Sequence, residues 1–275
     1  MLVAVIQLAY GDDESVADRV DRVAALVRDQ RGHDLVVLPE LWAAGGFAYA
    51  SWESRAETPQ GAVAAAMGAA ARDAGVVLHA GSIVETSSDG STGPEGKDLW
   101  NTSLVFDRDG TLQATYRKIH RFGFGAGEPR LMEAGEQIVC ADLAVGADRA
   151  PVRVGLSTCY DLRFPELYRA QLDRGATMFV IPAAWPRARV QHWTILAHAR
   201  AIEDQCVVVA CNTAGTHAGT EMGGHSQVVL PTGEAAAMAG LGEEVLSVDV
   251  DLGAVGSWRE SFPVLGDRRL PDHAH

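Results

Sequence analysis

The chain has 275 residues, a formal net charge of −13, 47% hydrophobic residues and 21% charged residues. This acidity argues against nucleic acid as a partner, because phosphate recognition needs clustered lysine and arginine. No apolar run approaches the roughly 20 residues of a membrane span, and four cysteines do not make a disulfide framework in a chain this long. Residues 1–7 lack the basic leader and cleavage site of a signal peptide, so we expect a first strand and a cytoplasmic protein.

Along the chain, one pattern recurs: an amphipathic helix, a glycine and then a short apolar strand. The first helix is expected to begin after Asp12 or Asp13, and its valines follow helical spacing. The expected helices cover residues 16–31, 62–74, 164–174 and 192–205. The expected strands include residues 35–38, 76–78, 103–106, 178–181, 207–210, 227–230 and 245–250. Such alternation predicts an α/β fold with covered sheets.

The chain is expected to form a single domain over residues 1–275. Its one low-complexity segment, residues 87–96, is polar and is expected to be a surface loop. No linker divides the chain, and we find no convincing internal repeat. The tail from about residue 257 places apolar side chains among charged ones, so it is expected to pack on a partner subunit or, equally, on its own domain.

Glu40 follows the apolar run 35–38 and Pro39, so it stands at the end of an expected strand. Trp42 and two more aromatic residues follow closely among glycines, which indicates the wall of a pocket. A carboxylate in such a pocket can act as a general acid or base. The alternative is a surface glutamate at a strand end, which is the usual position for this residue type.

Lys118 stands at the end of another expected strand, after Thr115-Tyr-Arg. An ammonium that is fixed at a strand end can stabilise negative charge that develops during a reaction. On spacing alone, a solvated surface lysine fits the sequence as well.

Cys159 ends the apolar run 152–158, and Pro165 shortly after it suits the first turn of a helix. The thiol is therefore expected in a strand-to-helix turn, where unpaired backbone N–H groups, that of Tyr160 among them, can bind an oxyanion. A helix N-terminus and a nearby ammonium would also favour the thiolate. The alternative is a buried structural cysteine.

Five segments, in this order, resemble the carbon–nitrogen hydrolase (nitrilase) superfamily. They are Pro39-Glu40, Tyr116-Arg-Lys118, Cys159-Tyr-Asp-Leu-Arg-Phe-Pro-Glu166, residues 193–203 and residues 224–234. The resemblance covers nearly the whole chain and implies a four-layer α-β-β-α sandwich. It also implies a homodimer that pairs through helices next to the active site.

The resemblance implies a catalytic triad in which Cys159 is the nucleophile, Glu40 the general base and Lys118 the cation. It further implies a second glutamate between Lys118 and Cys159. The candidates are Glu128, Glu133 and Glu136. Glu128 fits the family pattern best. The implied chemistry uses no metal and no organic cofactor.

The expected reaction is hydrolysis of a non-peptide C–N bond in a small amide, through a thioester on Cys159 and with release of ammonia. The resemblance is to the branch of omega-amidases and deaminated-glutathione amidases, so the expected substrate is an ω-amide of a short dicarboxylic acid. N-carbamoyl amides and nitriles are alternatives within the superfamily. A cysteine–histidine hydrolase, or a catalytically silent binding or scaffold protein on the same fold, would be a different class.

Several side chains are candidates for substrate binding. A guanidinium can hold a substrate carboxylate through bidentate contacts, and three arginines could do so: Arg121, Arg187 and Arg189. Each could instead be a surface arginine. Trp185 follows an expected strand and is expected to line the pocket together with Trp42. Arg163 and Glu166, three residues apart at a helix start, are expected to form a structural ion pair.

Overall fold

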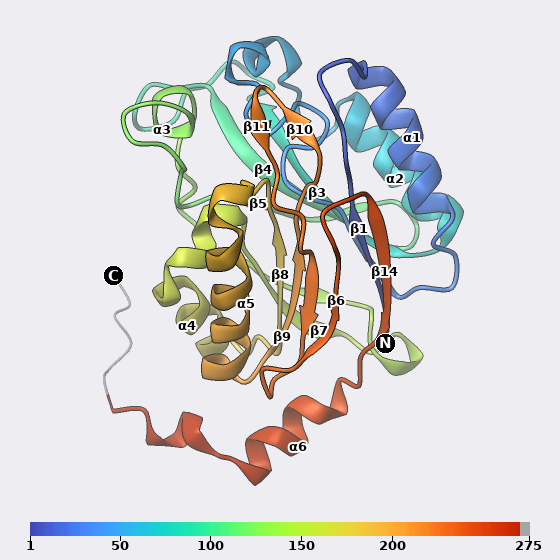
Figure 1. The fold of residues 1–275 in the computed structure, drawn as a ribbon, viewed down its shortest axis with the longest axis vertical. Coiled ribbons are helices and arrows are strands. Elements are labelled where there is room, and N and C mark those ends of the chain that lie inside the picture. The colour runs from blue at the N-terminus through green and yellow to red at the C-terminus, as the bar shows by residue number, and fades with distance from the viewer. Residues whose placement is uncertain (270–275) are drawn as a thin grey trace.

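The computed structural model describes residues 1–269. Two six-stranded β-sheets lie face to face, and helices cover the outer face of each sheet (Figure 1). The structure confirms the α/β fold and the four-layer α-β-β-α sandwich. Within residues 1–269, no helix has the length and apolarity to cross a membrane. Residues 270–275, the last part of the predicted tail, lie outside the described residues.

The first sheet is built around three parallel strands. Its strands are β1 (Leu2–Gln7), β2 (Leu35–Val37), β3 (Val77–Thr86), β4 (Leu99–Phe106), β5 (Leu112–Arg117) and β14 (Glu244–Asp249). Their order is β14-β1-β2-β3-β4-β5. β1, β2 and β3 run parallel because a helix connects each to the next. β14, β4 and β5 pair antiparallel with their neighbours.

The second sheet has the same number of strands. They are β6 (Cys140–Leu143), β7 (Val152–Leu156), β8 (Met178–Pro182), β9 (Val207–Cys211), β12 (Gln227–Val229) and β13 (Ala235–Met238). Their order is β13-β12-β9-β8-β7-β6, with β7, β8 and β9 parallel. A separate hairpin consists of β10 (Thr216–His217) and β11 (Thr220–Glu221).

Four helices form the outer layers. The helices of the described chain are α1 (Val16–Arg28), α2 (Ala62–Ala74), α3 (Glu128–Leu131), α4 (Pro165–Asp173), α5 (Val190–Asp204) and α6 (Gly253–Ser261). α1 and α2 cover the first sheet, and α4 and α5 cover the second (Figure 1). α1 is capped by Ser15, whose side chain accepts the N–H of Asp18, and not by Asp12 or Asp13. α2 has the predicted bounds and ends at Gly75, whose φ of 72° suits glycine.

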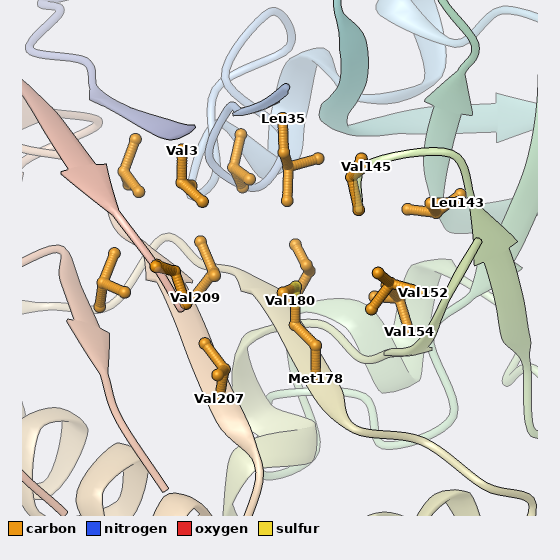
Figure 2. Packing of buried hydrophobic residues seen from close by; sticks show 14 of the residues in the cluster. Val3, Leu35, Leu143, Val145, Val152, Val154, Met178, Val180, Val207 and Val209 are labelled. Carbon is orange, nitrogen blue, oxygen red and sulfur yellow. The ribbon is translucent and has the colours of Figure 1, made fainter. Parts of the chain in front are cut away.

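The space between the sheets is filled by apolar side chains from both of them. Val3 and Leu35 of the first sheet lie across from Val180 and Val209 of the second (Figure 2). Full burial of such a side chain contributes roughly 1.5–3 kcal/mol. This central layer holds the two sheets together.

The next residues along the same strands point to the opposite side, because side chains alternate along a strand. Ala4 and Ile6 of β1 pack under α1 and α2. Phe179 and Ile181 of β8 pack under α4 and α5. Burial on both faces explains why these strands are continuous apolar runs in the sequence.

The two sheets repeat one topology, which the sequence analysis did not anticipate. Strands β1 to β5 correspond in order to β7, β8, β9, β12 and β13, and β14 corresponds to β6. Residues 31–42 and 174–185 share arginine, glycine, valine, proline and tryptophan at equal spacings. The expectation of no internal repeat is therefore wrong.

The described part of the C-terminal tail packs on its own chain. Val255 of α6 is buried in the central layer. Arg259 donates hydrogen bonds to the carbonyls of Gln205 and Asp204. Phe262 remains 51% exposed, and contact of the tail with a partner subunit stays a prediction.

Candidate active site

Glu40 lies just after β2 and takes partners from both sheets. Its side chain is buried. Oε2 accepts the N–H of Ala184, which follows β8, at 2.8 Å. Oε1 accepts hydrogen bonds from Lys118 Nζ at 2.7 Å and from Asn101 Nδ2 at 2.8 Å. These bonds fix the orientation of the carboxylate.

Lys118 directly follows β5, and its ammonium is buried between two carboxylates. Nζ lies 2.7 Å from Glu40 Oε1 and 2.8 Å from Glu128 Oε2. Burial by itself lowers the pKa of a lysine, but Glu128 and Glu40 outweigh it and hold the pKa of Lys118 well above its usual value. The ammonium therefore stays charged inside the protein.

Glu128 begins α3 and is the second carboxylate at this ammonium. Its oxygens accept hydrogen bonds from Asn101 Nδ2 at 2.6 Å and from the N–H of Phe122 at 2.5 Å. Burial raises the pKa of Glu128, and Lys118 partly opposes that effect. Asn101 thus bridges Glu40 and Glu128.

The structure separates the three glutamates that were candidates for this position. Glu133 is buried elsewhere and accepts the N–H of Lys97 at 2.8 Å. Glu136 is exposed. Only Glu128 of these three contacts Lys118.

Cys159 lies where β7 passes into a short 3-10 turn, Cys159–Arg163. Its φ is 50°, in the left-handed region, which costs a residue with a side chain roughly 1–2 kcal/mol. The turn is held by a capping box between Thr158 and Asp161.

The thiol of Cys159 is held in its protonated form. Burial and then the charge of Glu40 raise its pKa well above the usual value, and Lys118 only partly lowers it. The ammonium thus favours the thiolate, as expected, but burial and the charge of Glu40 outweigh it. Such a thiol needs a base to take its proton, and Glu40 is suited to that task.

Two adjoining cavities open onto Cys159. The inner one, of about 250 Å³, is lined by Glu40, Lys118 and Glu128 in addition to Cys159. The outer one, of about 240 Å³, also reaches Cys159. These volumes include open solvent, and the centres of water-sized molecules can occupy only about 20 Å³ in each cavity, so the arrangement suits a small substrate.

The outer cavity contains some of the residues predicted to bind substrate. Trp185 and Arg189 line it, together with Tyr160 and Arg163. The Tyr160 ring lies edge-on to Phe122 with centroids 5.3 Å apart. The assignment of the Tyr160 backbone N–H to an oxyanion hole stays a prediction.

Other predicted binding residues lie elsewhere in the described chain. Trp42 is packed in the core beneath α1 and α2, and its indole N–H donates to the Ala80 carbonyl. Arg121 forms a bidentate ion pair with Glu95, in the polar loop. Neither residue lines either of the two cavities that open onto Cys159, so the structure does not bring Trp42 or Arg121 to the thiol with the other predicted residues.

The two remaining arginine predictions also need correction. Arg187 pairs with Glu221 on the surface. Arg163 does not pair with Glu166: its guanidinium lies 3.3 Å from His192 Nδ1 and 4.7 Å from the centroid of the Trp185 ring.

Sequence reasoning missed three residues of the site: Asn101, Phe122 and Arg163. Asn101 begins the buried polar stretch Asn101-Thr-Ser103 within β4, and polar residues inside a buried strand were the signal that could have found it. Phe122 lines both cavities from a glycine-rich loop and gave no comparable signal. Within residues 1–269, no group of three or more His, Cys, Asp or Glu residues could hold a metal ion.

A buried thiol, an ammonium and two carboxylates that meet between stacked mixed sheets define a class of α/β enzymes with a cysteine at the reaction centre. The sequence profile described as "Carbon-nitrogen hydrolase" matches residues 2–260. The chain therefore belongs to the carbon–nitrogen hydrolase family, and the predictions of this superfamily and of an enzyme of this class are confirmed.

Two relatives with assigned names cover nearly the whole chain. The chain is 45% identical over 267 residues to the 2-oxoglutaramate amidase of Paenarthrobacter nicotinovorans, covering 97% of this chain and 89% of that protein. It is 32% identical over 272 residues to the human omega-amidase NIT2, covering 97% and 94%.

Among solved structures, the chain resembles the CN-hydrolase superfamily protein XC1258 of Xanthomonas campestris with a TM-score of 0.86 and 27% identity, covering 98% of each chain. It resembles Nit3 of Saccharomyces cerevisiae, a member of the nitrilase superfamily, with a TM-score of 0.83 and 28% identity, covering 98% and 97%.

Proposed function

We propose that this hydrolase cleaves the ω-amide of a short dicarboxylic acid, such as a 2-oxo acid with an amide at its far end. The names of the relatives, 2-oxoglutaramate amidase and omega-amidase, point to this substrate class. The observation that carries the proposal is a pair of arginines in the outer cavity, which also reaches Cys159.

These arginines, Arg163 and Arg189, have no carboxylate partner among the described residues. Burial lowers the pKa of Arg163, and the charge of Arg189 adds to that effect. An anion between two guanidinium groups would relieve their repulsion and form charge-assisted hydrogen bonds. A substrate with its amide at Cys159 and its carboxylate at the arginines meets both conditions.

In the first half of the proposed reaction, Glu40 takes the thiol proton as the Cys159 sulfur attacks the amide carbon. The negative charge on the tetrahedral oxygen is stabilised by Lys118 and by the backbone N–H of Tyr160. Each such donor is worth about 3–4 kcal/mol. Glu40 then gives the proton to the departing nitrogen. Ammonia is released, and the acyl group remains on Cys159 as a thioester.

In the second half, Glu40 takes a proton from water as the water oxygen attacks the thioester carbon. The C–S bond breaks, the acid leaves and the thiol regains its proton. One amide and one water thus give one carboxylic acid and one ammonia. Glu128 holds the Lys118 ammonium, and Asn101 donates to both Glu128 and Glu40, so together they keep Glu40 and Lys118 in place throughout.

An N-carbamoyl amino acid is the second candidate substrate, because it also combines a cleavable C–N bond with a carboxylate. Ammonia release should be measured over ω-amides of four- and five-carbon dicarboxylic acids, with and without a 2-oxo group, aliphatic amides, N-carbamoyl amino acids and nitriles. We expect the highest kcat/KM for an ω-amide and no release by the Cys159→Ala variant. A higher kcat/KM for an uncharged amide, a carbamoyl compound or a nitrile would contradict the proposal.

The role of the arginines can be tested apart from the chemistry. Arg163→Met and Arg189→Met should each raise KM for the ω-amide roughly 10- to 100-fold, the cost of a lost hydrogen bond to a charged group. The same variants should leave the kcat/KM of an uncharged amide within about 3-fold. Arg187→Met is the matched control, since Arg187 pairs with Glu221 outside the cavity. Equal losses on charged and uncharged amides would contradict carboxylate binding.

We also propose that residues 1–275 act as one catalytic domain in a cytoplasmic homodimer. The dimer is supported by α5, which presents Ile195 and Ile202 to solvent at 57% and 54% exposure. The Phe262 side chain of the tail is also exposed. A reducing compartment would keep the Cys159 thiol available. A monomeric mass by sedimentation at micromolar concentration would contradict the dimer.

A further inference from the structure

Asp161 is a buried carboxylate two residues after Cys159, and the proposed reaction does not use it. Its side chain is 0% exposed, and it has four hydrogen-bond contacts. Oδ2 accepts the N–H of Thr158 at 2.8 Å and the hydroxyl of Tyr116 at 2.7 Å. Oδ1 accepts the backbone N–H of His120 at 2.9 Å and lies 2.7 Å from its Nδ1. A buried carboxylate with this many donors is held rigidly.

The donors come from two segments that the two sheets supply. Thr158 belongs to the turn that carries Cys159 and follows β7. Tyr116 and His120 lie on either side of Lys118, at the end of β5. Asp161 therefore ties the segment of the ammonium to the segment of the nucleophile.

Two further contacts strengthen this tie. The hydroxyl of Tyr116 accepts the N–H of Ile119 at 3.3 Å, so the chain on each side of Lys118 is held. The His120 ring stacks on Phe164, with centroids 3.8 Å apart and planes 7° from parallel. Phe164 follows the turn of Cys159, so the stack joins the same two segments.

The tie matters because Cys159 sits in a conformation that its own chain does not favour. Its φ of 50° persists only if neighbouring bonds impose it. The bond from the Thr158 N–H to Asp161 fixes the residue just before Cys159. The ion-pair partners of the Lys118 ammonium, Glu40 and Glu128, lie outside the turn that carries Cys159.

We propose that Asp161 is a positioning residue that sets the distance between the Cys159 thiol and the Lys118 ammonium. It touches neither the substrate nor the reacting atoms. A displacement of about 1 Å in such an arrangement can lower a rate about 100-fold. The proposal depends on Cys159 as nucleophile but not on which amide is the substrate.

Asp161→Asn tests the proposal, because the amide keeps the shape but turns one acceptor into a donor that faces other donors. We expect kcat to fall about 100-fold with KM within about 3-fold. The alkylation of Cys159 by iodoacetamide, which needs no substrate, should slow and shift to higher pH. That direction follows because Lys118 lowers the pKa of the thiol, so a displaced ammonium raises it.

A pair of tyrosine variants supplies the matched control and covers the case in which Asp161→Asn does not fold. Tyr116 and Tyr168 are both fully buried, and each has one side-chain partner for its hydroxyl: Asp161 for Tyr116, and Ser157, at 2.8 Å, for Tyr168. Tyr116→Phe should lower kcat about 10-fold and shift the alkylation profile to higher pH. Tyr168→Phe should lose similar stability but keep kcat and that profile.

The outcome separates a positioning role from a structural one. If Asp161→Asn and Tyr116→Phe only lower the melting temperature, and the folded variants match Tyr168→Phe in kcat and alkylation, the proposal is wrong. If no amide in the substrate panel is hydrolysed but alkylation responds as expected, the proposed substrate is wrong and the positioning role stands.

Discussion

The two sheets share one topology, yet their equivalent positions carry different chemistry. Glu40 of the first half corresponds to Ala183 of the second. Leu35 of β2 and Met178 of β8 are equivalent, and they pair with Val3 of β1 and Val154 of β7. Val3 is therefore equivalent to Val154, and Leu8, five residues further on, is equivalent to Cys159. Two equivalent residues even meet, since the N–H of Glu40 donates to the Ala183 carbonyl at 3.4 Å. The repeated framework supplies strand ends, and single residues at those ends supply the reactive groups.

The comparison also shows how one residue type takes two roles. Trp42 and Trp185 follow the same proline at the same spacing. The indole N–H of Trp42 bonds to Ala80 in the core, whereas that of Trp185 bonds to the Arg189 carbonyl beside the outer cavity. Equivalent positions in a repeat therefore do not imply equivalent function.

The largest effect on kcat is expected from a change at Cys159, the reactive group of the second half. Cys159→Ser should lower kcat by about 10⁴-fold or more, because an alcohol beside Glu40 stays protonated and attacks poorly. Cys140→Ser, a change at a free cysteine of the same sheet, should leave kcat unaltered. A serine variant within about 10-fold of the original enzyme would remove the thiol from the mechanism.

A smaller effect is expected from a change at Lys118, the cation of the first half. Lys118 follows β5, whereas alanine follows β13, the counterpart of β5 in the second half. Lys118→Met should lower kcat roughly 100- to 1,000-fold, because the ammonium acts on the transition state. Arg117→Met is the matched control: this neighbouring cation pairs with Glu85 at 2.6 Å, away from the cavities that open onto Cys159. A loss confined to KM would make Lys118 a binding residue.

The smallest effect concerns stability. Leu35 pairs with Val77 and Met178 pairs with Val207, so Val77 and Val207 are equivalent positions of the two halves. Ala74 of the first half is therefore equivalent to Asp204 of the second. Burial raises the pKa of Asp204 to about 7, and Arg169 opposes that effect. Because the folded pKa exceeds the unfolded value, the stabilisation is complete below about pH 4 and is lost as pH rises through about 7.

Asp204→Asn should therefore flatten the dependence of unfolding free energy on pH between 4 and 7. Between pH 4 and pH 8 the stability of the variant relative to the original protein should rise by roughly 4 kcal/mol, because each unit of the pKa difference contributes about 1.4 kcal/mol. Urea unfolding at several pH values measures this. The exposed Asp142, changed to Asn, is the control, and an unchanged slope for Asp204→Asn would refute the assignment.

The resemblance to the carbon–nitrogen hydrolase superfamily singled out Glu40, Lys118 and Cys159. Spacing alone pointed to Glu40 and Cys159, which follow apolar runs, but not to Lys118, because β5 alternates between exposed and partly buried residues. Continuous apolar runs between helices predicted the α/β fold with covered sheets, and the resemblance implied the four layers. The three assignments of catalytic roles still await the tests above.

Other parts depended on contacts that only the folded chain shows. Asn101 belongs to the site because β4 lies beside the end of β5, where its carbonyl accepts the N–H of Lys118. Arg121 lies outside the site because the polar loop folds back and places Glu95 against its guanidinium. Arg163 belongs to the site because the turn after Cys159 directs its side chain toward Trp185. Long-range packing of loops is not encoded in local spacing.

The pairing of β1 with β14 has a consequence for biosynthesis (Figure 1). The side chain of Gln7 donates to the carbonyl of Gly240, 233 residues later. On the ribosome, β1 therefore emerges long before the strand that covers its edge. An uncovered strand edge can pair with other chains and aggregate. A chaperone that shields this edge until β14 has been translated should raise the yield of active enzyme.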